Sequence, residues 1–414
     1  MDRHLAARFF FEVAVIIVAC RLMGLVARRL GQPQVVGEMI AGIVLGPSLL
    51  GWLLPDMQRA IFSPQTRPVL DVVSQVGLVL YMFTIGLELD MAQVRRQARS
   101  ALSISLAGVL APLLLGGLLA WAIHGDATLF PAGVPIGTAM LFMGTALSVT
   151  ALPVLARIIQ ERGLLGTPLG TLVLAAGLID DVIAWCLLAL VLATMSGAAS
   201  GALLAIGGAI SYVAIALLLR RTALLRFETA FALAGQMTAP MLAIALALLL
   251  LSAWFTDTAG IHAIFGAFVF GAALPRGRAA ESIRALVEPM TVSLFLPLFF
   301  AQSGLNTQLA LVDTPFLWGL VLAVIVVACL GKGVACWAAA LASGVSPRAA
   351  RGVGALMNAR GLIELIMLNV ALSAGIIAPA LFSVMVIMAL ATTALATPLF
   401  VWLYERGERL AGTQ

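Results

Sequence analysis

The chain has 414 residues, of which 62% are hydrophobic and 10% are charged. Ordinary globular domains are about half apolar and a quarter charged, so this composition excludes a typical soluble fold and indicates a chain embedded in a lipid bilayer. The net charge of +5 does not point to nucleic-acid binding, because the sequence has no basic tract with interleaved aromatic residues.

Hydropathy predicts about thirteen membrane-spanning segments, because roughly 17–25 apolar helical residues cross a bilayer. The first follows a short charged start and is not closed by an A-x-A-like cleavage site, so it is predicted to be a membrane helix and not a signal peptide. The segments are expected at about 9–27, 33–53, 69–88, 100–123, 134–157, 167–194, 199–219, 228–254, 260–275, 288–305, 315–342, 350–372 and 375–404.

Arginines follow every odd-numbered segment, whereas the even-numbered connections hold only Arg59 and Arg67. The positive-inside rule therefore predicts that the arginine-rich connections are cytoplasmic. On this count the N-terminus lies outside, the C-terminus lies in the cytoplasm, and the chain is expected in the inner (plasma) membrane. Only residues 405–414 follow the last segment, so no C-terminal nucleotide-binding domain is expected.

Two short sequence patterns recur along the chain. Tyr81–Asp90, YMFTIGLELD, resembles Phe299–Gln308, FFAQSGLNTQ, and Ala41–Gly46, AGIVLG, resembles Gly266–Gly271, GAFVFG. The separation is similar in both cases and covers about seven segments, an odd number, so the second copy is inverted relative to the first. Inverted repeats are typical of secondary transporters, whose substrate site lies near the bilayer midplane. The alternative is chance similarity between glycine-rich apolar strings.

Charged residues inside the apolar segments are few, and they are informative because burying an ion in hydrocarbon is costly. Asp180 and Asp181 lie in the middle of the sixth segment, in GLIDDVIAW. Adjacent residues on a helix point about 100° apart, so the two carboxylates meet different neighbours. A desolvated carboxylate holds a proton more strongly than an exposed one, so a proton and a metal cation compete for it. The pair therefore predicts a titratable cation site, and two acids that serve helix packing are the alternative.

Lys332 lies in the eleventh segment, in CLGKGVACW, and is the only lysine in the chain. A buried lysine can lose its proton, whereas arginine stays protonated. This contrast predicts that Lys332 is a proton carrier or the partner of Asp180. A salt bridge that never titrates is the alternative.

The fifth and twelfth segments combine mid-membrane polar residues with proline or glycine. Proline frees backbone carbonyl groups, and irregular backbone at membrane depth is tolerated only where it is buried or lines a cavity. The two segments occupy corresponding positions in the repeats, so they are predicted to be discontinuous helices that form the site. The polar residues concerned are Thr145, Ser148 and Thr150 before Pro153, and Asn358, Arg360 and Glu364 around Gly361.

These residues also have simpler interpretations. Hydroxyl groups in a kinked helix can bond back to their own helix, and Arg360 and Glu364 can pair with each other at a spacing of four. Glu38 could line a funnel or pair with Arg360, Glu88 is interpreted as structural, and His262 as a packed core residue. The four cysteines and three histidines are too scattered to predict a disulfide or a metal cage.

Five stretches of the chain form a set: VVGEMIAGIVLGPSLLG at Val35–Gly51, FTIGLELD at Phe83–Asp90, TALSVTALPVLARIIQERGLL at Thr145–Leu165, IDDVIAW at Ile179–Trp185 and GALMNARGLIELIMLN at Gly354–Asn369. Together, and in this order, they resemble the monovalent cation:proton antiporter superfamily. The nearest branch holds Nap-type bacterial sodium/proton antiporters, Kef-type potassium efflux proteins and plant cation/proton exchangers. The resemblance extends from about Phe9 to Tyr404, nearly the whole chain.

The resemblance implies an all-α polytopic fold with inverted repeats, in which two discontinuous helices cross. The chain is then a single transmembrane antiporter domain over 1–414 that forms a homodimer in membrane lipid. A dimerisation subdomain is implied at about 9–68 and 199–305, and a mobile core subdomain at about 69–198 and 306–404.

The resemblance also assigns roles to the candidate residues. Asp181 is implied as the principal carboxylate for cation and protons, and Asp180 as the partner of Lys332 in a salt bridge. Thr150 and Ser148 are implied to lie beside the cation. The paired acids resemble electrogenic members of the family, which exchange two protons for one cation.

The sequence therefore predicts a secondary transporter, not an enzyme, that exchanges Na⁺ or Li⁺ for protons by alternating access. No cofactor is expected, because the ions are the cargo, and Na⁺ is expected at Asp181. A K⁺/H⁺ antiporter or Kef-like efflux protein is the alternative, although Kef-type proteins tend to have glutamine before the aspartate. A sodium-coupled solute symporter would need a larger pocket, and an intramembrane aspartyl protease would need aspartates that converge from different helices.

Overall fold

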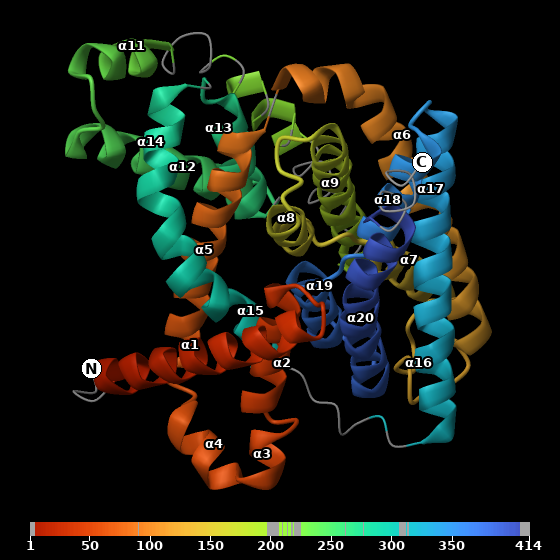
Figure 1. The fold of residues 1–414 in the computed structure, drawn as a ribbon. Helices are drawn as coiled ribbons and strands as arrows, with labels where there is room; N and C mark the ends of the chain where they lie inside the picture. The colour runs from red at the N-terminus through yellow and green to blue at the C-terminus, as the bar shows by residue number, and fades with distance from the viewer. Residues whose placement is uncertain are drawn as a thin grey trace.

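The computed structural model describes residues 5–89, 91–196, 225–260, 262–275, 277–305 and 314–405, with residue 312 and a few positions between 207 and 218. Within these residues the regular structure is helical throughout (Figure 1). The helices are α1 (Leu5–Arg29), α2 (Gln34–Leu45), α3 (Leu50–Leu53), α4 (Pro55–Ile61), α5 (Arg67–Glu88), α6 (Met91–Ile123), α7 (Ile136–Ser148), α8 (Leu152–Glu161), α9 (Pro168–Ser196), α11 (Leu225–Ala234), α12 (Ala239–Thr258), α13 (Ala263–Ala273), α14 (Arg278–Met290), α15 (Leu296–Leu305), α16 (Pro315–Ala328), α17 (Ala335–Ala342), α18 (Pro347–Leu356), α19 (Leu362–Ser373) and α20 (Pro379–Phe400).

π-helical turns continue several of these helices without a break. Thr291–Phe295 joins α14 to α15, Cys329–Val334 joins α16 to α17, and Val401–Glu405 extends α20. With such joins counted, ten helical segments in the described part of the chain are long and apolar enough to cross a membrane. The predicted count of about thirteen stays a prediction, because most of the segment expected at 199–219 lies outside the described residues.

Two of the predicted segment boundaries are wrong. The segment expected at 228–254 is divided between α11 and α12, because Gly235 adopts a positive φ of 71° and a proline occupies the first turn of α12. The segment expected at 260–275 is the short helix α13 of 11 residues. An average of hydropathy over a long window does not resolve a local break of this kind.

The outward-facing side chains agree with a lipid environment. On α6, Leu110, Leu114 and Leu118 are 54%, 67% and 59% exposed and recur every four residues, so they form one apolar face. A soluble protein rarely presents such large apolar stripes to water. The opposite face of α6 packs against α7 and α9.

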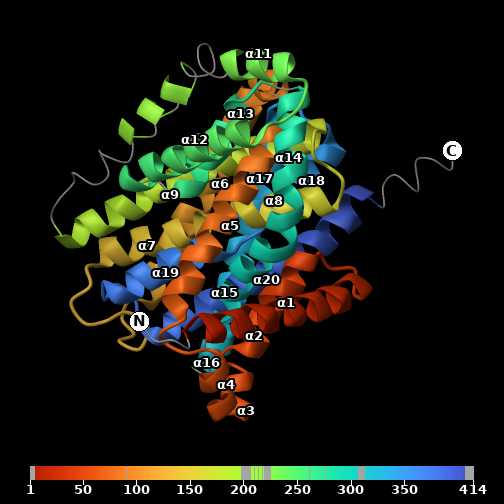
Figure 2. The same cartoon turned by 90° about the vertical axis from the view of Figure 1, so that its left-hand side faces the viewer.

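The helices form two groups that pack mainly within themselves. The scaffold, as we name it, contains α1, α2, α5 and α12–α15, and the crossing bundle contains α6–α9 and α16–α20. Figure 1 shows the scaffold on the left and most of the crossing bundle on the right, and Figure 2 shows the same molecule from its left-hand side. The groups meet where α8 packs on α2 and α5 and where α19 packs on α15.

The predicted inverted repeat is present in the packing of the scaffold. α2 packs on α15, and its repeat counterpart α13 packs on α5, the counterpart of α15. A Cβ atom at Gly304 would lie 2.4 Å from the backbone nitrogen of Ile43, and one at Gly86 would lie 2.3 Å from the carbonyl oxygen of Phe268. Ile43 and Phe268 are aligned positions of the repeat, as are Gly86 and Gly304, so the two crossings are equivalent.

Two discontinuous helices cross inside the bundle, as predicted. The extended residues between α7 and α8 meet those between α18 and α19, where the Ala151 N–H donates to the Ala359 carbonyl at 3.0 Å. The Thr150 hydroxyl lies 3.3 Å from the Met357 carbonyl oxygen at the same crossing. Four helix ends therefore converge at one point, each with backbone groups that lack an intrahelical partner.

Candidate functional site

Asp180 lies beside the crossing with no exposed surface, and its carboxylate has three donors. The Ser105 hydroxyl, on α6, donates to Oδ1 at 2.5 Å. The Thr150 hydroxyl, from the extended α7–α8 connection, donates to Oδ2 at 2.8 Å, and the Lys332 ammonium reaches the same oxygen at 2.8 Å. Hydrogen bonds that involve a charged group are shorter and stronger than those between neutral groups.

Lys332 is fully buried in the π-helical turn between α16 and α17. Its ammonium group donates to Asp180, to the Gly108 carbonyl oxygen at 3.1 Å and to the Ser148 carbonyl oxygen. All three ammonium protons therefore have acceptors. The structure brings together Asp180 and Lys332, the pair that the sequence predicted, and adds the end of α7 as a third member.

Asp181 has different surroundings from its neighbour, although it is only 3% exposed. Among the residues that the structure describes, neither of its carboxylate oxygens accepts a hydrogen bond of normal geometry. The backbone N–H of Leu152, the first residue of α8, is directed at this carboxylate. A helix N-terminus carries a partial positive charge, so the start of α8 places the positive end of a helix dipole beside Asp181.

Arg360 joins the two discontinuous helices. Its guanidinium donates to the Ala146 carbonyl oxygen at 2.9 Å and to that of Leu147, and it lies 3.4 Å from the Glu364 carboxylate. Together with Lys332 on Ser148, two cations therefore cap three consecutive carbonyls at the end of α7. This arrangement neutralises the partial negative charge of a helix C-terminus inside the bundle.

The other polar residues of the twelfth predicted segment are also buried. Asn358 donates through Nδ2 to the Gly354 carbonyl oxygen at 2.8 Å, while its Oδ1 has no partner among the described residues. The Arg360 backbone is held by Thr393 on α20, whose hydroxyl accepts from its N–H at 2.8 Å and donates to its carbonyl at 2.7 Å. α20 thus fixes the non-helical backbone at the crossing.

The structure does not bring every predicted hydroxyl to the carboxylates. The Ser148 hydroxyl donates to the Thr145 carbonyl oxygen at 2.7 Å, and the Thr145 hydroxyl donates to that of Leu141 at 2.7 Å. Both are bonded back to α7, which was the simpler of the two interpretations. Ser148 contributes its carbonyl oxygen, not its hydroxyl, to Lys332.

Three further interpretations are settled by their contacts. Glu38 accepts from the Gln34 side chain at 2.7 Å, so the suggested pair with Arg360 is wrong, because the Arg360 guanidinium is directed to α7 and Glu364. Glu88 pairs with Arg284 of the scaffold. His262 accepts from the Ile264 N–H at the start of α13 and lies against the Trp185 ring, so it is a packed residue.

Sequence reasoning missed the residues that support the two predicted acids. Ser105 carries no signal, because a single serine in an apolar helix is common and usually bonds to its own helix. Gly108 contributes only a backbone carbonyl, which the sequence does not mark. Arg157 and Glu161 of α8 were not considered, although a spacing of four predicts their 2.8 Å ion pair.

Comparisons with known proteins agree on one family. The family described as sodium/hydrogen exchanger, transmembrane, matches residues 14–406. The Na⁺/H⁺ antiporter NhaS4 of Synechocystis sp. is 38% identical over 98% of this chain and 99% of its own length. Cation/H⁺ antiporter 17 of Arabidopsis thaliana is 35% identical over 98% of this chain, which spans 50% of the plant protein.

Another relative is named for a different ion. K⁺/H⁺ antiporter 1 of Saccharomyces cerevisiae is 33% identical over 97% of this chain and 47% of its own length. Among solved structures, the sodium proton antiporter MjNhaP1 of Methanocaldococcus jannaschii aligns with a TM-score of 0.65, covers 96% of both chains and is 16% identical. At that identity the structural match supports the fold alone.

Proposed function

We propose that this chain, which belongs to the sodium/hydrogen exchanger family, exchanges Na⁺ or Li⁺ for protons across the membrane that its helices span many times. One observation supports this most directly. Two neighbouring carboxylates are buried at the crossing. Asp180 accepts hydrogen bonds from Ser105, Thr150 and Lys332, whereas neither oxygen of Asp181 accepts one of normal geometry from the described residues. A free, buried carboxylate is where a cation and a proton compete.

The exchange follows from the positions of Asp181 and Lys332. A cation at Asp181 displaces its proton and adds a positive charge near the Lys332 ammonium. That repulsion weakens the bond between Lys332 and Asp180 and favours loss of the lysine proton. One proton from Asp181 and one from Lys332 then leave for each cation that enters, so one net charge crosses the membrane per cycle.

Alternating access is proposed as movement of the crossing bundle against the scaffold. The contacts of α5 favour one change to the division expected from the sequence. α5 packs along α13 and α15, so we assign Arg67–Glu88 to the scaffold, with the bundle beginning at α6. The scaffold is the proposed site of homodimer formation, with the N-terminus outside and the arginine-rich ends cytoplasmic in the inner membrane.

A K⁺/H⁺ antiporter is the second candidate, because the fungal relative is named for potassium. Sodium and potassium take the same oxygen ligands and are distinguished by the size and rigidity of the cavity. The arrangement of Asp180, Asp181 and Lys332 serves either ion.

The test is proton flux in proteoliposomes with an imposed pH gradient, with sodium, lithium and potassium added in turn. We expect sodium and lithium to dissipate the gradient in the wild type and Asp181→Asn to abolish the response. Asp56→Asn is the control, because this carboxylate in α4 is 98% exposed, and it should leave the flux unchanged. Potassium as the effective ion would favour the second candidate, and no response to any alkali cation would refute the proposal.

A further inference from the structure

The last turn of α8 makes a set of polar contacts with the scaffold that lie apart from the ion site. The Gln34 N–H, at the start of α2, donates to Glu161 Oε2 at 2.7 Å. Gln160 donates through Nε2 to Glu288 on α14 at 2.6 Å and accepts from the Tyr81 hydroxyl on α5 at 3.3 Å. Arg162, the next residue, donates to the Gly31 carbonyl oxygen in the connection between α1 and α2 at 3.2 Å. One turn is thus bonded to four parts of the scaffold.

Each partner is itself held in place within its own group of helices. On α8, Arg157 binds the other oxygen of Glu161 at 2.8 Å. On the scaffold, the Gln34 side chain accepts from Arg28 at 2.5 Å and donates to Glu38 at 2.7 Å, and Glu288 accepts from Arg284 at 2.7 Å. The contacts therefore join two preformed polar clusters and not isolated flexible side chains.

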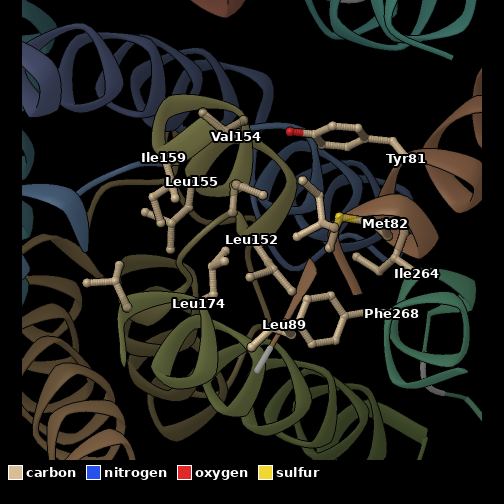
Figure 3. Packing of buried hydrophobic residues seen from close by; sticks show 14 of the residues in the cluster. Tyr81, Met82, Leu89, Leu152, Val154, Leu155, Ile159, Leu174, Ile264 and Phe268 are labelled. Carbon is tan, nitrogen blue, oxygen red and sulfur yellow. The ribbon is translucent and has the colours of Figure 1, made fainter. Parts of the chain in front are cut away.

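These contacts lie at one edge of an apolar interface. Figure 3 shows Leu152 of α8 beside Met82 of α5 and Phe268 of α13. The Tyr81 hydroxyl points toward α8 at the edge of this layer (Figure 3). Half-buried polar groups that lose their partners cost free energy, so the polar edge helps to keep the interface closed.

The repeat counterpart of α8 lacks such residues. α19 reads LIELIMLNVALS, and its only charged residue, Glu364, lies in the first turn beside Arg360. The far end of α19 therefore has no charged side chain with which to bind the scaffold. Of the two half-helices that lead away from the ion site, only α8 ends in charged groups.

We propose that Gln160, Glu161 and Arg162 form a latch that holds the crossing bundle against the scaffold at the arginine-rich end of the molecule. α8 begins at Leu152, beside Asp181, and ends at the latch, so a movement that opens the ion site toward this end must first break these contacts. The structure is then the state that is closed on the side we assign to the cytoplasm. The inference rests on the proposed division into a scaffold and a moving bundle.

The latch is tested by the accessibility of a cysteine at Val35, a fully buried residue next to Gln34. The free cysteines Cys20, Cys186, Cys329 and Cys336 are replaced first, and Val35→Cys is introduced. The rate of labelling by a water-soluble maleimide is then measured in lipid nanodiscs. Glu161→Gln and Gln160→Ala should each raise this rate about tenfold or more, because each weakens hydrogen bonds that involve a charged group.

Arg351→Gln is the matched control. It removes an exposed hydrogen bond of 3.3 Å to the Pro347 carbonyl oxygen, which lies within α18 of the crossing bundle and touches no latch residue. Its labelling rate should equal that of the parent. Unchanged rates in both latch variants, or an equal rise in the control, would overturn the inference. If one latch variant fails to fold, the other still decides, because they break separate contacts.

The labelling experiment does not depend on transport. A faster rate with no cation-driven proton flux would sustain the latch and refute the proposed exchange. Normal exchange with unchanged labelling would support the proposed exchange and refute the latch.

Discussion

At the scale of single residues, Asp180 and Asp181 show how two neighbours in the chain acquire different chemistry. Successive residues on a helix point about 100° apart. One carboxylate therefore meets Ser105, Thr150 and Lys332, while the other meets the start of α8. The oxygens of the first are bound by fixed donors, and the second keeps its oxygens for a cation or a proton. Division of labour between the acids thus follows from their place on α9.

Ser105 should matter for exchange although it touches no ion. Ser105→Ala leaves ionised Asp180 with one donor fewer, and hydrogen bonds to charged groups contribute about 1.5–3 kcal/mol. We expect the sodium-driven proton flux to fall about tenfold and Ser105→Thr, which keeps the hydroxyl, to restore most of it. Equal fluxes in Ser105→Ala and the wild type would show that Asp180 does not need this donor.

At the scale of helices, the two glycine crossings of the scaffold are equivalent, so equivalent substitutions should have similar effects. Gly304→Ala and Gly86→Ala each place a Cβ within 2.4 Å of another helix's backbone, which cannot move aside as a side chain would. Overpacking of this kind costs roughly 1–3 kcal/mol.

Thermal unfolding of the purified protein checks this expectation. Both variants should lower the melting temperature by a similar amount. Gly319→Ala on α16 is the control, because no atom lies within 4 Å of its added Cβ, and it should leave the melting temperature unchanged or raise it slightly. A drop at only one of the two crossings would contradict their equivalence.

Much of the crossing could be predicted because its residues violate the rules of an apolar helix. Pro153 lies in the first turn of α8, just after the break that its position suggested, and Gly361 lies at the second break. Lone charges such as Lys332 could be identified for the same reason, because a charged residue is rare within an apolar segment. Ser105 and the Gly108 carbonyl could not be predicted, since a serine and a backbone oxygen break no rule until the fold brings them to a charge.

The latch residues could not be predicted from the sequence for a related reason. Gln160 and Glu161 follow the fifth predicted segment, at 134–157, where polar residues are expected to face water. Only the packing of α8 on α2 and α5, with the hydrogen bond from Gln160 to Glu288 of α14, shows that they lie between two groups of helices. Tertiary contacts over more than 120 positions in the sequence leave no local pattern.

At the scale of the whole molecule, the proposed cycle moves charge, because two protons exchange for one cation. Moving one elementary charge through 100 mV is equivalent to about 2.3 kcal/mol, or roughly a 50-fold cation gradient. The exchange should therefore respond to the membrane potential. In proteoliposomes clamped with potassium and valinomycin, an imposed potential alone should drive sodium movement in the wild type.

Lys332→Gln should remove this response while keeping some exchange. Glutamine carries no exchangeable charge, so only the Asp181 proton remains to leave when a cation enters, and one proton then balances one cation. Asp180 keeps its bonds from Ser105 and Thr150, which supports a folded site without the lysine. We expect sodium-driven proton flux that is slower but no longer changes with the clamped potential. A variant whose flux still follows the potential would show that Lys332 does not carry the second proton, and its bond to Asp180 would then be structural.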